Sequence, residues 1–241
     1  MFLTGFLFIS TYIQAMVPVE SNLPANLIQL KAQHPDCELL NKLSENYDVF
    51  LDVYKSCNYQ FWSGCGSYLF DGVSYAYCEK MYEKQKLFYE TAKKCNNLLE
   101  VGVYMGHSIF IALLANPDLE ITCIDIDDHY SGPALEVLSQ KFNKKIDFIK
   151  GDSIVELPLI DKKFDMFHID GHHTSYYLNA EFLQCLTKCS SEHVFFIVDD
   201  YDSYPNTINK LLKDNDVYTV VSFIIPPCSW CNIMIEILLQ Q

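Results

Sequence analysis

The sequence predicts an α/β protein: a doubly wound sheet with an antiparallel C-terminal strand, preceded by a helical N-terminal region. From residue 98 onward, short apolar runs alternate with helix-like stretches, which is typical of a parallel sheet covered on both faces. The last two apolar runs are joined by a short loop with two prolines instead of a helix, which indicates an antiparallel pair. Before residue 96, apolar side chains recur at three- and four-residue steps, as they do in helices.

Two helices and a loop are expected in the N-terminal region. Helical spacing covers residues 36–55 and 76–94, and the second stretch ends in lysines that suit the negative end of a helix dipole. Residues 57–75 contain three glycines and many aromatic residues, which predicts an ordered loop. Aromatic side chains such as Trp62 and Tyr68 either form a lid over a ligand or belong to an ordinary core or dimer surface. We divide the chain into a cap or lid region, 1–95, and a sheet domain, 96–241.

The sheet domain is expected to alternate strands and helices. The predicted strands are 98–103, 121–126, 146–150, 164–169 and 194–198, and the helices between them are 107–115, 132–142, 153–157 and 175–189. The run from Val194 to Val198 is apolar throughout, as in a central parallel strand. Residues 217–225 and 232–239 form the closing antiparallel pair.

Composition and charge argue against binding to nucleic acid. The chain has 241 residues, 50% of them hydrophobic, so it can bury a proper core. Its 31 acidic residues outnumber 17 basic ones, giving a net charge of −14, and all of the basic residues are lysine. An acidic chain without arginine is a poor candidate for binding nucleic acid. We expect a small-molecule partner, no nucleic acid or membrane, and allow a homo-oligomer.

Ten cysteines and the apolar N-terminus bear on the compartment. Several cysteines lie within apolar runs, so reduced core thiols are favoured over disulfides, and a zinc site built on Cys228 and Cys231 is disfavoured because a second tight pair is missing. Residues 2–17 are too short and too mixed to span a membrane. A cleaved secretion signal is the minor alternative. We therefore expect a cytoplasmic protein.

The clearest local motif is EVGVYMGHS at residues 100–108. A buried strand runs into a glycine turn and then a helix, so Gly102 allows the turn and Gly106 leaves the helix N-terminus open to a ligand. Glu100 places a carboxylate at the strand end. The spacing G-x-x-x-G differs from the G-x-G-x-x-G of dinucleotide-binding proteins. A plain strand-to-helix turn is the alternative.

Acidic residues end the next two strands. Asp125 follows the second strand about 20 residues after the glycine turn, where a carboxylate accepts hydrogen bonds from ribose hydroxyls. Asp127 and Asp128 read as a solvated loop. Asp152 follows the third strand and either receives an adenine amino group or, like Ser153, caps the next helix.

Carboxylates also end the fourth and fifth strands. Asp170 follows one, and Asp199 and Asp200 follow the other, so the three are expected to converge in the crevice where open α/β sheets bind ligands. Because like charges repel, a divalent cation such as magnesium, calcium or manganese is favoured over three separate caps. His173 lies three residues beyond Asp170 and is a candidate base for a substrate hydroxyl.

These motifs, in this order, resemble the class I S-adenosylmethionine-dependent methyltransferases, which implies a Rossmann-like fold over residues 95–241. Residues 169–173, Ile-Asp-Gly-His-His, with Val198-Asp199-Asp200, resemble metal-dependent O-methyltransferases of sugars and related hydroxyls, the macrocin O-methyltransferase type. The resemblance implies that Asp170, Asp199 and Asp200 hold magnesium and that His173, or Asp170 itself, takes the proton. The implied methyl-donor site contains Glu100, Gly102, Gly106, Ser108, Asp125, Gly151, Asp152 and Ser153.

Two other functions stay open at this stage. A nicotinamide-dependent oxidoreductase uses a related sheet, although the glycine spacing and the missing arginine count against it. A non-catalytic domain of the same fold is the other alternative, and the presence of all three candidate metal ligands argues against it. The acceptor is not specified by any motif.

Overall fold

The computed structural model describes residues 23–213, 216–228 and 231–240. The apolar stretch 2–17 and its alternative as a secretion signal lie outside the described residues. Within the described part, every helix is too short or too polar to cross a membrane.

Between residues 23 and 95, the described part of the N-terminal region, the chain forms five short helical segments. They are α1 (Ala25–Gln33), α2 (Glu38–Glu45), α3 (Tyr47–Ser56), η1 (Glu79–Met81) and α4 (Tyr82–Ala92). The prediction of one helix over 36–55 is wrong, because α2 and α3 meet at Asn46. The Asn46 side-chain amide donates to the Lys42 carbonyl at 2.9 Å, and its backbone leaves the helical region at φ −119°. Polar side chains bonded to nearby carbonyls compete with helix continuation in this way.

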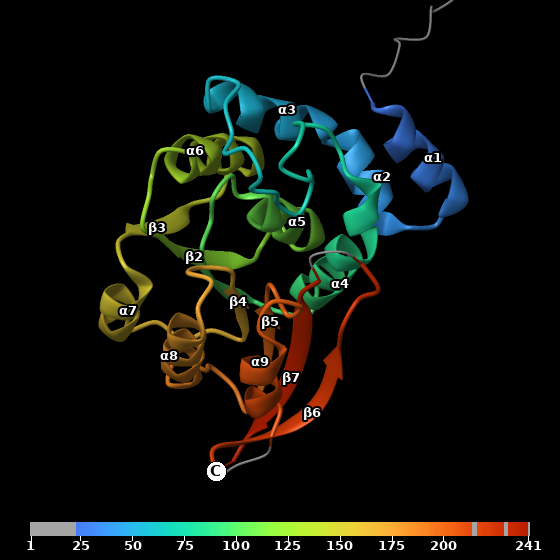
Figure 1. Cartoon of the computed structure of the whole chain (residues 1–241). Coiled ribbons are helices and arrows are strands. Elements are labelled where there is room, and N and C mark those ends of the chain that lie inside the picture. The colour runs from blue at the N-terminus through green and yellow to red at the C-terminus, as the bar shows by residue number, and fades with distance from the viewer. Residues whose placement is uncertain (1–22, 214–215, 229–230, 241) are drawn as a thin grey trace, which may run out of the picture.

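A seven-stranded sheet forms the centre of the molecule (Figure 1). Its strands are β1 (Asn97–Val101), β2 (Glu120–Asp125), β3 (Ile146–Lys150), β4 (Met166–Ile169), β5 (His193–Val198), β6 (Tyr218–Ile224) and β7 (Ile233–Leu239). They lie in the order β3-β2-β1-β4-β5-β7-β6, and β7 runs antiparallel to both of its neighbours. The predicted fold class, with a reversed strand inserted near the C-terminal edge, is confirmed.

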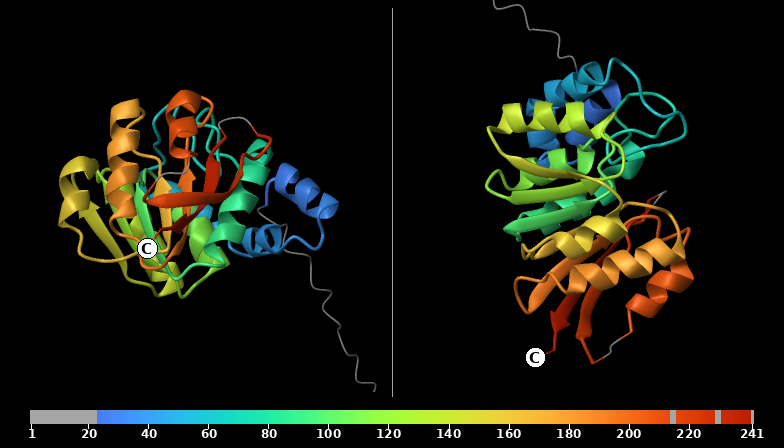
Figure 2. Two further views of the ribbon diagram at one scale, coloured as in Figure 1. Left: turned by 90° about the horizontal axis from the view of Figure 1, so that it is seen from below. Right: turned by 90° about the vertical axis from the view of Figure 1, so that its left-hand side faces the viewer.

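Helices cover both faces of the sheet (Figure 2). The helices that follow β1 are α5 (His107–Ala115), α6 (Ser131–Phe142), α7 (Ser153–Glu156), η2 (Leu157–Leu159), α8 (Ser175–Leu186) and α9 (Pro205–Leu211). One apolar core joins α5 and α6 to strand side chains such as Leu98, and a second joins α8 and α9 to side chains such as Leu99. Consecutive residues of one strand thus feed opposite cores, as the pleat requires.

The N-terminal helices share the first of these cores. Leu27 of α1, Phe50 of α3 and Phe88 of α4 are fully buried in the same cluster as Phe110 of α5. Tyr68, one of the aromatic residues proposed for a lid, is only 2% exposed and packs in this cluster as well. Residues 23–95 therefore pack directly on the sheet domain, with a continuous apolar interior.

Strand register brings the chemically interesting loops to one edge of the sheet. Val101 pairs with Ile169, and Ile169 pairs with Val198, so the residues that follow each strand emerge side by side. The backbone continues the pairing by one residue, because the Asp199 amide donates to the Ile169 carbonyl at 3.0 Å. The carboxyl ends of the parallel strands consequently form a single row, where such sheets bind ligands.

Candidate active site

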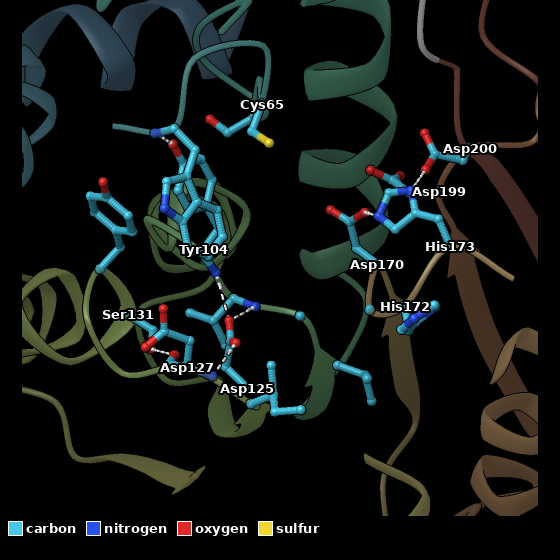
Figure 3. A pocket seen from close by; sticks show the side chains of 18 of the residues that line it. Cys65, Tyr104, Asp125, Asp127, Ser131, Asp170, His172, His173, Asp199 and Asp200 are labelled. Atoms are coloured by element: carbon cyan, nitrogen blue, oxygen red, sulfur yellow. Dashed lines mark hydrogen bonds and ion pairs between the residues drawn. The ribbon is translucent and has the colours of Figure 1, made fainter. Parts of the chain in front are cut away.

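A cavity of about 720 Å³ opens along the carboxyl edge of the sheet. Residues that follow all five parallel strands line it, and segments of the N-terminal region close it from the other side. Figure 3 shows two groups of side chains in this cavity: Asp125, Asp127, Tyr104 and Ser131 in one, and Asp170, Asp199, Asp200 and His173 in the other. Its volume lies within the roughly 300–1,000 Å³ usual for small-molecule sites.

Asp125 is held rigidly at one end of the cavity. Its Oδ2 accepts hydrogen bonds from the backbone amides of Val103 at 2.8 Å and Tyr104 at 2.9 Å, and its Oδ1 accepts one from the Asp127 amide at 3.0 Å. The Val103 and Tyr104 amides come from the glycine turn after β1, and the Asp127 amide comes from the loop after β2, so the carboxylate ties two neighbouring loops together. Three of the roughly four lone-pair positions of the carboxylate are thus used, and Oδ1 keeps capacity for one further hydrogen bond.

Gly102 makes the glycine turn possible. Its φ is +85°, and a Cβ atom there would lie 2.0 Å from the Asp170 carbonyl oxygen. Only glycine avoids both the backbone strain and the collision. The turn after β1 is therefore packed directly against the loop that carries Asp170, and Gly102 lines the cavity as predicted.

Asp152 begins helix α7 and lines the same cavity. Its Oδ1 accepts a hydrogen bond from the Ile154 amide at 3.0 Å, and its Oδ2 accepts one from the Tyr177 hydroxyl at 3.1 Å. The capping interpretation is confirmed, while the contact with adenine stays a prediction. Gly151 and Ser153 also line the cavity.

Glu181 lies behind Ser153 and carried no sequence signal of its own. The Ser153 hydroxyl donates to Glu181 Oε1 at 2.5 Å, and the Glu181 side chain is 1% exposed. Burial outweighs this hydrogen bond and raises the pKa of Glu181 to about 7.

Three of the predicted donor-site residues do not line the cavity. Glu100, Gly106 and Ser108 lie one layer behind its wall. Glu100 is fully buried because its side chain points across the sheet, where it accepts hydrogen bonds from the Ser108 hydroxyl at 2.8 Å and shares one with His168 Nδ1 at 2.9 Å. These three residues thus lie outside the lining of the cavity, and their contact with a methyl donor stays a prediction.

His168 connects this buried layer to the carboxylates. Its Nε2 lies 3.1 Å from the Tyr68 hydroxyl, and that hydroxyl donates to Asp199 Oδ1 at 3.0 Å. Burial alone would lower the pKa of His168, but the neighbouring carboxylates of Glu100 and Asp199 raise it to about 10. The prediction that His168 is packed inside the protein is confirmed, since it is fully buried.

Asp170, Asp199 and Asp200 come together as predicted, but they do not form one set of ligand atoms. Their ligand atoms approach within 4.8 Å in two overlapping groups among the described residues: His168, Asp170 and Asp199, and Asp170, His173 and Asp200. The predicted metal site of three carboxylates is therefore divided, because Asp199 pairs with Lys84 while Asp200 pairs with His173.

Lys84 of helix α4 pairs with the carboxylate of Asp199. Its ammonium lies 2.6 Å from Asp199 Oδ2, and both side chains are buried. Although burial acts against its charge, Lys84 with His168 holds the pKa of Asp199 well below its usual range. Sequence analysis missed Lys84, although it lies three residues after Met81 and four before Phe88, on the apolar side of the helix.

His173 lies beside the two other carboxylates of the cluster, Asp170 and Asp200. It forms an ion pair with Asp200 through Nδ1, and its Nε2 lies 4.0 Å from Asp170 Oδ1. The hydrogen bond that the imidazole donates to Asp200 outweighs partial burial and raises the pKa of His173 to about 9. An imidazole beside a carboxylate in a cavity wall is suited to accept a proton from a bound hydroxyl.

Comparison with known proteins agrees with this geometry. Residues 99–201 match a family model described as a methyltransferase domain. Over 98 residues the chain is 34% identical to tapetum-specific methyltransferase 1 of Arabidopsis thaliana, covering 38% of this chain and 42% of that protein. It is 33% identical over 121 residues to an Arabidopsis thaliana protein named "putative caffeoyl-CoA O-methyltransferase", covering 45% of this chain and 52% of that one. The chain thus spans about half the length of these curated relatives.

Solved structures share the fold. The O-methyltransferase TomG of Streptomyces achromogenes, solved with S-adenosylmethionine, superposes with a TM-score of 0.54 at 18% identity, covering 66% of this chain and 80% of that one. A Bacillus cereus O-methyltransferase solved with SAH gives a TM-score of 0.57 at 12% identity, covering 79% of this chain and 90% of that one. The family match is thus confined to residues 99–201, and the solved structures show that the fold is shared.

Proposed function

We propose that this chain transfers the methyl group of S-adenosylmethionine to a hydroxyl of a small molecule, sugars included. One observation carries the proposal: a single cavity joins a nucleoside-type end, with Asp125 and Asp152, to a carboxylate end with His173 and Asp170. The excess of acidic groups in this cavity suits a cationic sulfonium donor. The match to a methyltransferase domain and the O-methyltransferase names of the relatives support the same reaction.

The chain's own residues would act mainly by positioning. In the proposed reaction the acceptor oxygen attacks the sulfonium methyl carbon, the carbon–sulfur bond breaks, and a neutral thioether leaves. His173 accepts the hydroxyl proton on Nε2, because its Nδ1 is already paired with Asp200. Asp125 would hold the ribose, and Asp152 would face the adenine, so the methyl group points toward the carboxylate end.

A divalent cation fits the open part of the carboxylate cluster. Asp170 and Asp200 offer hard oxygen donors, and with His173 their ligand atoms lie within 4.8 Å of one another. When bound, such an ion would hold acceptor oxygens and lower the hydroxyl pKa. Asp199, the third predicted ligand, would join it only after separating from Lys84.

Donor binding is the first test. Calorimetric titration of the full chain with S-adenosylmethionine and with its demethylated product should show saturable binding, and Asp125→Asn should weaken both. Lys141→Met, a change at an exposed surface lysine, serves as the control and should leave binding unchanged. Binding of NAD with no response to S-adenosylmethionine would instead revive the oxidoreductase hypothesis.

Methyl transfer is the second test. A panel of catechols, phenols and free or glycosidic sugars is incubated with methyl-labelled donor, and methylated products are identified by mass spectrometry. His173→Gln should lower turnover about 10²–10⁴-fold, while binding of the demethylated donor stays close to that of the unchanged chain. Donor binding with no product from any hydroxyl would favour the non-catalytic binding domain.

A further inference from the structure

Helix α4 delivers a lysine to the carboxylate cluster from the N-terminal region. Lys84 is 6% exposed, lines the cavity, and places its ammonium 2.6 Å from Asp199 Oδ2. The same ammonium lies 4.4 Å from the centre of the Tyr68 ring, within cation–π range. A buried lysine so close to a carboxylate is a permanent positive charge at one side of the cluster.

Both oxygens of Asp199 accept hydrogen bonds from buried side chains. Oδ2 accepts from Lys84, and Oδ1 accepts from the Tyr68 hydroxyl at 3.0 Å, with His168 Nε2 at 3.8 Å. Asp170 and Asp200, by contrast, have their oxygens beside the exposed imidazole of His173. The cluster is thus split into a half neutralised by Lys84 and a half that lies beside His173, and both line the cavity.

We propose that Lys84 is an internal competitor of the divalent cation at this cluster. While the ammonium holds Asp199, the cation finds only the half formed by Asp170, His173 and Asp200, and it gains Asp199 only by displacing the lysine. The inference deepens the proposed function and rests on its metal site, but it does not require methyl transfer. Lys84 is accordingly a residue that sets metal affinity, with no proton transfer assigned to it.

The charges around Asp199 support competition between Lys84 and a divalent cation. An ammonium within ion-pair distance of a ligand repels an incoming divalent cation and occupies one of its donors, and in a buried site this repulsion is weakly screened. Removing the lysine leaves Asp199 buried without its cation, a state that a bound metal would relieve. Loss of Lys84 should therefore tighten metal binding and make folding more dependent on metal.

The closing experiment measures Mn²⁺ binding to the full chain after treatment with a chelator. Free Mn²⁺ is followed by electron paramagnetic resonance for the unchanged chain, Lys84→Met, and Lys86→Met, which removes the same charge from an exposed position of the same helix. We expect Lys84→Met to bind at least about tenfold more tightly and Lys86→Met to bind like the unchanged chain. The double variant K84M/D199N should lose the gain.

Lys84→Gln is a second substitution that keeps the test possible if Lys84→Met folds poorly. Lys84→Gln keeps a hydrogen-bond donor near Asp199 without the charge, and it should also bind Mn²⁺ more tightly and show a larger rise of Tm with Mn²⁺. Unchanged affinity in both variants, an equal gain in Lys86→Met, or no Mn²⁺ binding to any of them would overturn the inference. Donor binding and methyl transfer are measured separately, so either proposal can fail alone.

Discussion

His173 illustrates how one contact sets the chemistry of a side chain. Asp200 lies 27 residues further along the chain, yet its carboxylate pairs with Nδ1 of the imidazole. That pairing leaves Nε2 toward Asp170 and fixes which nitrogen can accept a proton. The sequence motif identified His173 as the candidate base, but only the structure shows which neighbour orients it.

The protonation of His173 gives the first prediction. With its pKa raised to about 9 by Asp200, the imidazole is charged at neutral pH, so turnover without added metal should rise with pH up to about 9. The ion pair contributes stability that is fully present below the unfolded pKa of about 6.5 and is lost as pH rises through about 9. Nuclear magnetic resonance titration of the imidazole in chelator checks this.

Asp200→Asn is the informative variant for that titration. Removing the carboxylate should bring the pKa of His173 back toward its ordinary value and move the pH dependence of turnover in the same direction. Asp202→Asn is a nearby control that leaves the ion pair in place. An unchanged His173 pKa in Asp200→Asn would contradict the assigned cause.

Glu181 gives a second prediction at the same scale. Burial raises its pKa to about 7, so its protonated form fits the fold best. Stability is fully present below the unfolded pKa near 4.5 and falls as pH rises through about 7. Glu181→Gln should flatten the loss of Tm between pH 4.5 and about pH 7, the range set by these two values, as measured by thermal unfolding. Parallel curves for both proteins would rule out this origin.

Gly102 shows how an element boundary depends on a distant loop. The glycine turn after β1 was recognisable from its spacing, but the reason for glycine at this position lies in the chain 68 residues later, at the Asp170 carbonyl. The same scale explains the error over residues 36–55. Apolar periodicity continues across Asn46, while its side chain bonds back to the preceding turn and ends the helix.

Gly102→Ala tests how much the glycine turn after β1 contributes to stability. A Cβ atom 2.0 Å from a backbone oxygen, at φ +85°, forces both loops apart and should cost at least about 3 kcal/mol of the free energy of unfolding. Gly132→Ala is a matched control, because its added Cβ meets only an ordinary contact at 3.9 Å. Chemical denaturation compares the two, and equal stability would show that the loops move apart freely.

Tyr68 connects parts of the molecule that are far apart in sequence. Its hydroxyl donates to Asp199, accepts from the Asn232 amide at 2.8 Å and lies beside His168. It thus ties the loop before α4 to the ends of β4 and β5 and to the start of β7. Because this hydroxyl is buried, its partners have no water to replace it.

Tyr68→Phe tests whether these connections between distant elements stabilise the fold. Losing the hydroxyl leaves buried polar partners unsatisfied, so the free energy of unfolding should fall by about 1–3 kcal/mol. Tyr59→Phe removes a hydroxyl from a side chain that is 62% exposed and should change stability little. If guanidinium unfolding gives the same midpoint for both variants, the connection does not stabilise the fold.

Sequence alone determined the alternation of strands and helices, the reversed strand near the end, and the acidic residues at strand ends. These features are local, because periodicity and turn residues are properties of short segments. The tertiary structure decided which distant side chain each of those acids pairs with. Asp199 is held by Lys84, 115 residues earlier, and Glu100 by His168, 68 residues later. Such pairings depend on packing between distant elements, which no spacing within one segment records.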